Sequence, residues 1–149
     1  MQLVALMLTG LELVPTGAHF FELWNKFALD QQQYFIIQQI YRGWAWFGIV
    51  LIAAIATNLA ASMMLWRSRD RFWPSLTAGL LLAVTLAVFF VWTYPANQAT
   101  GNWTTIPADW RALRRQWELS HAVNAVLTFA ALGFAAFSMR NVPVRGPRR

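Results

Sequence analysis

The chain contains 149 residues, of which 58% are hydrophobic and only 12% are charged. A soluble domain of this size carries about 25% charged residues, and the mean hydropathy here is +0.40. A soluble monomer, a disordered chain, a collagen and a coiled coil are therefore excluded. The sequence has no cysteine, which excludes thiol–disulfide relays, thiolate metal sites, iron–sulfur clusters and covalently attached haem. The net charge of +6 is explained by basic residues that anchor apolar helices at anionic lipid, so we expect a lipid bilayer as partner and no nucleic acid.

Four apolar segments predict four transmembrane helices, since each crossing needs about 20 mostly apolar residues. The first segment is the least regular, because ionisable side chains and a proline interrupt it. The third is the clearest, with Pro74 expected in its first helical turn and Pro95 expected to end it. We predict an all-α, four-transmembrane-helix bundle that forms one integral membrane domain over residues 1–149. The predicted spans are residues 3–24, 44–66, 75–94 and 117–139.

Two longer connections join these spans on the side opposite to the termini. Asp30 is placed to cap a short helix in the first connection, and Pro107 with Asp109 marks a helix start in the second. We therefore expect two short outward-facing helical connections. Residues 140–149 are basic and rich in proline, and they are predicted to form a mobile tail.

The distribution of basic residues predicts how the chain is oriented. Because cytoplasmic loops carry an excess of lysine and arginine, the side with more basic residues is expected to face the cytoplasm. We therefore predict a multi-pass protein of the cell inner membrane with both termini in the cytoplasm. The side of the termini carries Arg67, Arg69, Arg71, Arg140, Arg145, Arg148 and Arg149, and the opposite side carries Lys26, Arg42, Arg111, Arg114 and Arg115.

Polar side chains interrupt the first and fourth spans at helical spacing. An ionisable group at the centre of a transmembrane helix costs about 2.5–3.5 kcal/mol on insertion scales, so each one needs a partner or a wet cavity. At 100° per residue, the polar positions of each span fall within about 80° to 120° of one face. The first face contains Glu12, Pro15, His19 and Glu22, and the fourth contains Glu118, His121, Asn124 and Thr128.

The predicted topology brings these two faces together. His19 and Glu22 lie near the outward end of the first span, and an antiparallel fourth span places Glu118 and His121 at the same depth. We therefore predict one polar pocket near the outward face, with His121, His19, Glu118 and Glu22 as candidate catalytic residues. The residues expected to line this pocket are Tyr41, Arg42, Trp92, Tyr94, Asn97, Trp117 and Asn124.

Several interpretations of this polar cluster are compatible with the sequence. The groups could satisfy one another as buried polar contacts between helices, with Arg42 or Arg114 paired to a carboxylate. The four candidate catalytic residues could instead bind metal, because i,i+3 pairs of carboxylate and imidazole on facing helices are typical of di-iron bundles. Two further alternatives remain. One is a haem held between the two histidines, and the other is a metal-free pocket in which a histidine or carboxylate moves a proton on a hydrophobic substrate. We expect the deeper Glu12 to be a protonated carboxyl hydrogen-bonded across helices.

A short motif adds a family resemblance. Pro95 and Asn97 follow the third span, Trp117, His121 and Asn124 enter the fourth, and Gly17-Ala18-His19 precedes a polar turn in the first. This pattern resembles a family of small four-helix bacterial membrane proteins of unknown function that is related to anthrone oxygenases. The resemblance implies oxidation of an electron-rich polycyclic aromatic without a tightly bound organic cofactor.

Two classes of function follow from these patterns. The first is a membrane-embedded oxidoreductase or oxygenase-like enzyme that acts on a hydrophobic small molecule, either a lipophilic aromatic or a quinone-like compound. The second is a non-enzymatic structural or accessory membrane subunit. A metal- or haem-binding electron-transfer protein is a third alternative, and the sequence leaves open whether a cofactor binds.

Overall fold

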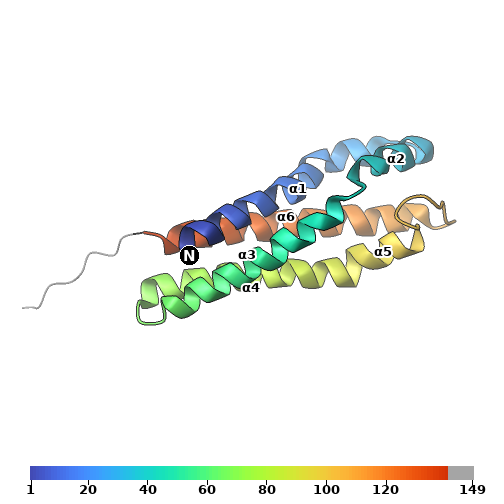
Figure 1. Cartoon of the computed structure of the whole chain (residues 1–149). Coiled ribbons are helices and arrows are strands. Elements are labelled where there is room, and N and C mark those ends of the chain that lie inside the picture. Colours follow the sequence, from blue (N-terminus) through green and yellow to red (C-terminus); the bar gives the residue numbers. More distant parts are fainter. Residues whose placement is uncertain (141–149) are drawn as a thin grey trace, which may run out of the picture.

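The computed structural model describes residues 1–140 and consists of a bundle of four long helices (Figure 1). Helix α1 runs from Gln2–Ala28, α3 from Phe47–Met64, α4 from Arg69–Val88 and α6 from Trp110–Ser138. The predicted all-α, four-helix bundle is confirmed. The basic tail predicted over residues 140–149 lies outside the described residues from position 141 onward.

Each long helix packs on two neighbours. Helix α1 lies between α3 and α6, and α4 also lies between α3 and α6, so the four helices form a square in cross-section. The inner half of the bundle, which is the half near the N-terminus, contains a core of alanine and leucine side chains. Small alanine side chains allow close approach of the helices. This cluster contains Leu51, Ala54, Ala78, Leu82, Ala131 and Ala135.

The polarity of the molecule is inverted relative to that of a soluble protein. Exposed side chains along the helices are large and apolar, among them Met7, Phe21, Trp46, Ile52 and Phe129. The buried side chains include many polar ones, such as Thr9, Glu12, His19, Asn58, Ser75, Thr85, Asn124 and Thr128. Four helical segments, including the short extensions of α3 and α4, are long and apolar enough to cross a membrane. We therefore treat the chain as a multi-pass membrane protein.

Short helices connect the long ones at the end of the bundle opposite to the N-terminus (Figure 1). After α1, the chain forms α2 (Gln31–Ile37), the 3₁₀ turn η1 (Gln38–Tyr41) and the 3₁₀ turn η2 (Trp44–Trp46). Asp30 caps α2 in a capping box, since its carboxylate accepts from the Gln33 backbone at 2.8 Å and Gln33 Oε1 accepts from the Asp30 backbone at 3.2 Å. In the second connection, the helix expected near Pro107 is the beginning of α6 itself, which starts at Trp110.

Neither proline of the third span acts as the sequence predicts. Helix α4 begins at Arg69, so Pro74 lies inside the helix and not in its first turn. At the other end, Pro95 does not end the span, because a π-helical turn η3 (Phe89–Thr93) leads directly into α5 (Tyr94–Ala99). A wider π turn relieves the clash between a proline ring and the carbonyl one turn earlier, which lets the helix continue.

Candidate functional site

The antiparallel pairing of α1 and α6 brings both histidines of the protein together. The ring centroids of His19 and His121 lie 4.2 Å apart, and Trp117 lies 4.9 Å from the first ring and 4.2 Å from the second. His19 is buried, and the Nδ1 atom of His121 is buried without a hydrogen-bond partner. The two imidazoles therefore form the centre of the site, within an aromatic environment.

Lys26 is the central charged residue of the site, and the sequence reasoning missed it. Its side chain is 2% exposed, and Nζ lies 3.2 Å from His19 Nδ1, 3.1 Å from Glu118 Oε2 and 3.5 Å from Glu22 Oε2. The ammonium also lies 4.8 Å from the centroid of the Tyr41 ring, within range of a cation–π interaction. An ammonium has only donors, so His19 Nδ1 accepts this hydrogen bond and His19 is held neutral with its proton on Nε2.

The Lys26 position could have been found from its spacing. It lies four residues after Glu22 and seven after His19, so it extends the polar face of the first span by one turn. The predicted span ended at residue 24 and left Lys26 outside, whereas α1 continues to Ala28.

Glu118 is fully buried and joins Lys26 to the first connection. Tyr34 donates a hydrogen bond to Glu118 Oε1 at 2.9 Å, and Gln38 Nε2 donates to the Tyr34 oxygen. Burial and the neighbouring Glu118 carboxylate raise the pKa of Tyr34 far above its usual value, so the phenol stays protonated. Helix α2 carries Tyr34 into the bundle and covers the site at the end opposite to the N-terminus (Figure 1).

Glu22 occupies the edge of the site. Its side chain is 40% exposed, and it accepts a hydrogen bond from the hydroxyl of Tyr41. Burial and this carboxylate raise the pKa of Tyr41 as well. Glu22 therefore links the η1 turn to α1 and does not face the two imidazoles directly.

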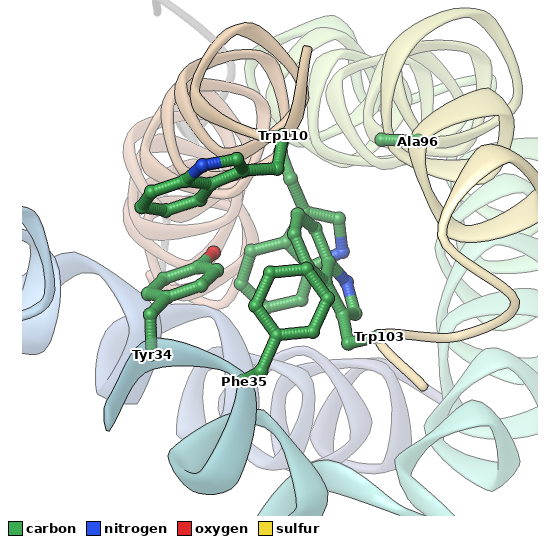
Figure 2. Close-up of a cluster of buried hydrophobic side chains, with 6 residues drawn as sticks. Tyr34, Phe35, Ala96, Trp103 and Trp110 are labelled. Carbon is green, nitrogen blue, oxygen red and sulfur yellow. The ribbon is translucent and has the colours of Figure 1, made fainter. Parts of the chain in front are cut away.

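An aromatic cluster covers the end of the bundle opposite to the termini. The rings of Tyr34 and Phe35 from α2, Trp103 from the loop after α5 and Trp110 from α6 pack together (Figure 2). Trp103 also contacts Trp117, with ring centroids 5.8 Å apart. These side chains, with Ala96, form a second buried core that is separate from the alanine and leucine core of the inner half.

Asn97 accepts hydrogen bonds from two indole rings of this cluster. Its Oδ1 atom accepts from Trp117 Nε1 at 2.8 Å and from Trp103 Nε1 at 3.2 Å. The continuation of the third span past Pro95 places Asn97 there. The amide therefore fixes the orientation of both indoles.

A cavity of about 680 Å³ opens beside the histidines. This volume is in the range of small-molecule sites, about 300–1,000 Å³. The surface of the wall is mainly apolar, and its polar residues include His19, His121, Asn97, Asn124 and Arg42. Of the predicted pocket residues, the structure places Tyr41, Arg42, Asn97, Trp117 and Asn124 along this cavity together with the two histidines.

The remaining predicted pocket residues lie elsewhere. Trp92, in the π turn, and Tyr94, in α5, are 50% and 43% exposed, and they are not among the residues that line the cavity. Trp92 instead borders an open surface groove between α1 and α6. Glu118 and Glu22 contact Lys26 behind the cavity wall.

The arginines proposed as carboxylate partners bind other groups. Arg114 donates to the backbone oxygens of Lys26 at 3.3 Å and Leu29 at 2.9 Å. These carbonyls belong to the end of α1, where the helix itself leaves acceptors unpaired. Arg42 donates to Gln39 Oε1 at 2.8 Å and is exposed.

The geometry does not favour the predicted metal and haem arrangements. Across residues 1–140, no group of three or more histidine, aspartate or glutamate side chains is arranged to hold a metal ion. Lys26 Nζ lies where such an ion would contact His19, Glu118 and Glu22, and it supplies the positive charge. The direct contact of the two imidazole rings leaves no room for a porphyrin between them.

Comparison of the chain with models of protein families, with curated proteins and with solved structures finds no match. The chemistry of the site therefore has to be argued from the chain's own residues.

Proposed function

We propose that the protein binds a lipophilic aromatic or quinone-like molecule in the cavity beside the two histidines and exchanges a proton with it. The observation that carries this proposal is that His121, whose buried Nδ1 atom has no hydrogen-bond partner, is one of the residues that line a mainly apolar cavity of about 680 Å³. Aromatic walls suit a planar apolar ligand, and a few polar groups at one side orient it. The fold class alone implies none of this.

The two imidazoles are suited to different roles. His121 has a free ring nitrogen and can accept a proton from an acidic O–H or C–H group of the ligand as a general base. His19 receives a hydrogen bond from Lys26 and keeps its Nε2 proton. Lys26 in turn is held by Glu118, so the orientation of His19 is fixed by a chain of buried contacts.

The family resemblance extends this proposal to oxidation. A ligand that has lost a proton to His121 becomes electron-rich, and dioxygen is the oxidant that an oxygenase of the anthrone type would use. We therefore include oxygenation of the deprotonated aromatic ring as the reaction class to test. This step rests on the resemblance carried by Pro95, Asn97, Trp117 and His121.

The distribution of exposed basic residues supports an outward-facing pocket. Of the five basic residues at the pocket end, Lys26 is buried in the site and Arg114 binds backbone carbonyls. Only Arg42, Arg111 and Arg115 remain exposed there, which increases the bias of free basic charge toward the end with the termini. We propose on this basis that the termini face the cytoplasm of an inner membrane.

A structural or accessory subunit is the second candidate, and one observation favours it. Tyr34, Glu118, Lys26 and His19 form a continuous chain of polar contacts that joins α2, α6 and α1. Such a chain stabilises the outward half of the bundle whether or not a ligand binds.

The experiment that separates the two candidates uses anthrone, which has an acidic C–H group, and a short-chain ubiquinone analogue as probes. Binding is measured by quenching of tryptophan fluorescence in detergent, and deprotonation of anthrone is followed by the absorbance of its anion and by oxygen uptake. We expect His121→Ala to abolish anion formation while the protein remains folded. Trp92→Phe, in the outer groove, is the matched control and should behave as wild type. Equal anion formation in wild type and His121→Ala would refute the proposal.

A further inference from the structure

A second set of polar side chains lies further inside the bundle than the histidines. Helices α1 and α6 are antiparallel, and two contacts fix their register: Gln2 lies 2.7 Å from Ser138, and His19 lies against His121. The same register places Glu12 level with Thr128 on the facing helix. Both positions are close to the middle of their helices. They therefore lie near the centre of the membrane.

These inner polar groups are buried without partners. Glu12, Asn124 and Thr128 are 6%, 5% and 0% exposed, and each has a side-chain oxygen without a hydrogen bond. Thr9 and Thr16, on the neighbouring turns of α1, instead donate to the carbonyl one turn earlier at 2.7 Å and 3.2 Å. Buried oxygens of this kind are normally satisfied by ordered water. The expected hydrogen bond of Glu12 across the helices is not formed among residues 1–140.

Pro15 adds a further acceptor on the same stretch of α1. Proline has no backbone N–H, so the carbonyl of Leu11 lacks its usual helical donor. Pro15 itself lines the cavity, as do Thr16 and Asn124. The cavity therefore reaches from the histidines to the turn above Glu12.

We propose that Glu12 is a protonated carboxyl at the inner end of a water-filled track, and that it exchanges its proton through this water with His121 in the cavity. In its described surroundings, no salt bridge joins Glu12 to a basic residue. Lys26 is fourteen residues away on the same helix, which is about 21 Å. An unpaired carboxylate at this depth is costly, whereas a protonated one needs only hydrogen bonds.

The length of the track fits a short chain of water. Seven residues separate Glu12 from His19 on α1, a rise of about 10 Å. About three hydrogen-bonded waters at about 2.8 Å spacing bridge this distance. Asn124 and Thr16 lie along it and supply intermediate contacts. The role of the track rests on the proposed function, because the track would carry a proton taken up by His121 to Glu12. The existence of the track is tested without any substrate.

The test measures the carboxylic-acid C=O stretch of the purified protein by infrared spectroscopy in H₂O and D₂O. We expect a protonated-acid band that is present in wild type, is lost in Glu12→Gln and is retained in the control Glu22→Gln. On transfer to D₂O the band should shift promptly, because the proton exchanges through the track. Absence of the band, or a band that does not shift over hours, would overturn the proposal.

A second pair of variants tests the track itself and does not depend on changing Glu12. Thr128→Val and Asn124→Leu keep the side-chain size but remove a polar group, and we expect each to keep the band while slowing its shift about tenfold or more. Exchange as fast as in wild type would refute the track. Loss of the acid band on addition of Na⁺, but not of choline, would show a cation site in place of a proton site. Each of these outcomes leaves the anthrone experiment on His121 unaffected, so the two proposals fail separately.

Discussion

Replacing Lys26 by methionine tests whether the buried charge cluster stabilises the half of the bundle opposite to the termini. Methionine keeps the length of the side chain but removes the ammonium, which leaves Glu118, 0% exposed, without its positive partner. Breaking a buried ion pair by removing one partner costs about 3–5 kcal/mol. The contact to Glu22 adds little, because that carboxylate is 40% exposed and exposed pairs contribute about 0–1 kcal/mol. We therefore expect Lys26→Met to lower the free energy of unfolding by about 3–5 kcal/mol.

The measurement is unfolding of detergent-solubilised protein by sodium dodecyl sulfate, followed by circular dichroism. The matched control is the double variant with Lys26→Met and Glu118→Gln, in which the amide still accepts the hydrogen bond from Tyr34 but carries no charge. We expect the double variant to recover about 2 kcal/mol relative to Lys26→Met. A loss below about 1 kcal/mol for the single variant, or no recovery in the double variant, would refute the reasoning that an uncompensated charge is the cost.

Two further predictions concern packing and pH. A Cβ atom at Gly79 would lie 2.8 Å from Leu59 Cδ2 and 3.1 Å from Leu59 Cγ, so Gly79→Ala must shift the Leu59 side chain at the contact of α3 with α4 and should destabilise the bundle by about 1–3 kcal/mol. Gly48→Ala meets no atom within 4 Å and should be neutral or stabilising by up to about 1 kcal/mol in the same unfolding assay; equal effects of the two substitutions would contradict this. The raised pKa of Tyr34 means that the unfolded chain loses this proton near pH about 10 while the folded chain keeps it. Stability is therefore fully present below that pH and falls above it. When the free energy of unfolding is measured on either side of that pH, its decrease should be smaller in Tyr34→Phe than in wild type. An identical decrease would argue against the buried phenol.

The spans were predictable because hydropathy responds to lipid exposure, which most of each helix surface experiences. The ends were less predictable, since they depend on backbone chemistry that a window of residues does not capture. Pro95 is the clearest case: its ring disfavours a regular helix, but the π turn at Phe89–Thr93 accommodates it. As a result the third span continues to Ala99.

Only the part of the site that follows from helical periodicity could be predicted from the sequence. The spacing of His19 and His121 on antiparallel helices was sufficient to predict that they share a depth, and their rings are in contact. The apolar pattern of the sequence does not indicate Lys26 as a site residue, because a charged residue just past an apolar segment is usually an interfacial anchor. Tyr34 was overlooked because its contribution depends on α2 folding back over the bundle, which no local pattern encodes.

The two cores of the bundle have different roles: one packs the helices together, and the other shapes the pocket. The core near the termini packs the helices closely through alanine and leucine side chains, and a buried hydrogen bond from Asn58 to Thr9 joins α3 to α1 there. The core at the end opposite to the termini is built from large rings, two of which, Trp103 and Trp117, also line the cavity. The shape of the cavity there depends on a fixed orientation of these two rings. Asn97 provides this, because one oxygen accepts from both Trp103 and Trp117. The pocket is thus shaped before any ligand arrives, which lowers the cost of binding a planar molecule.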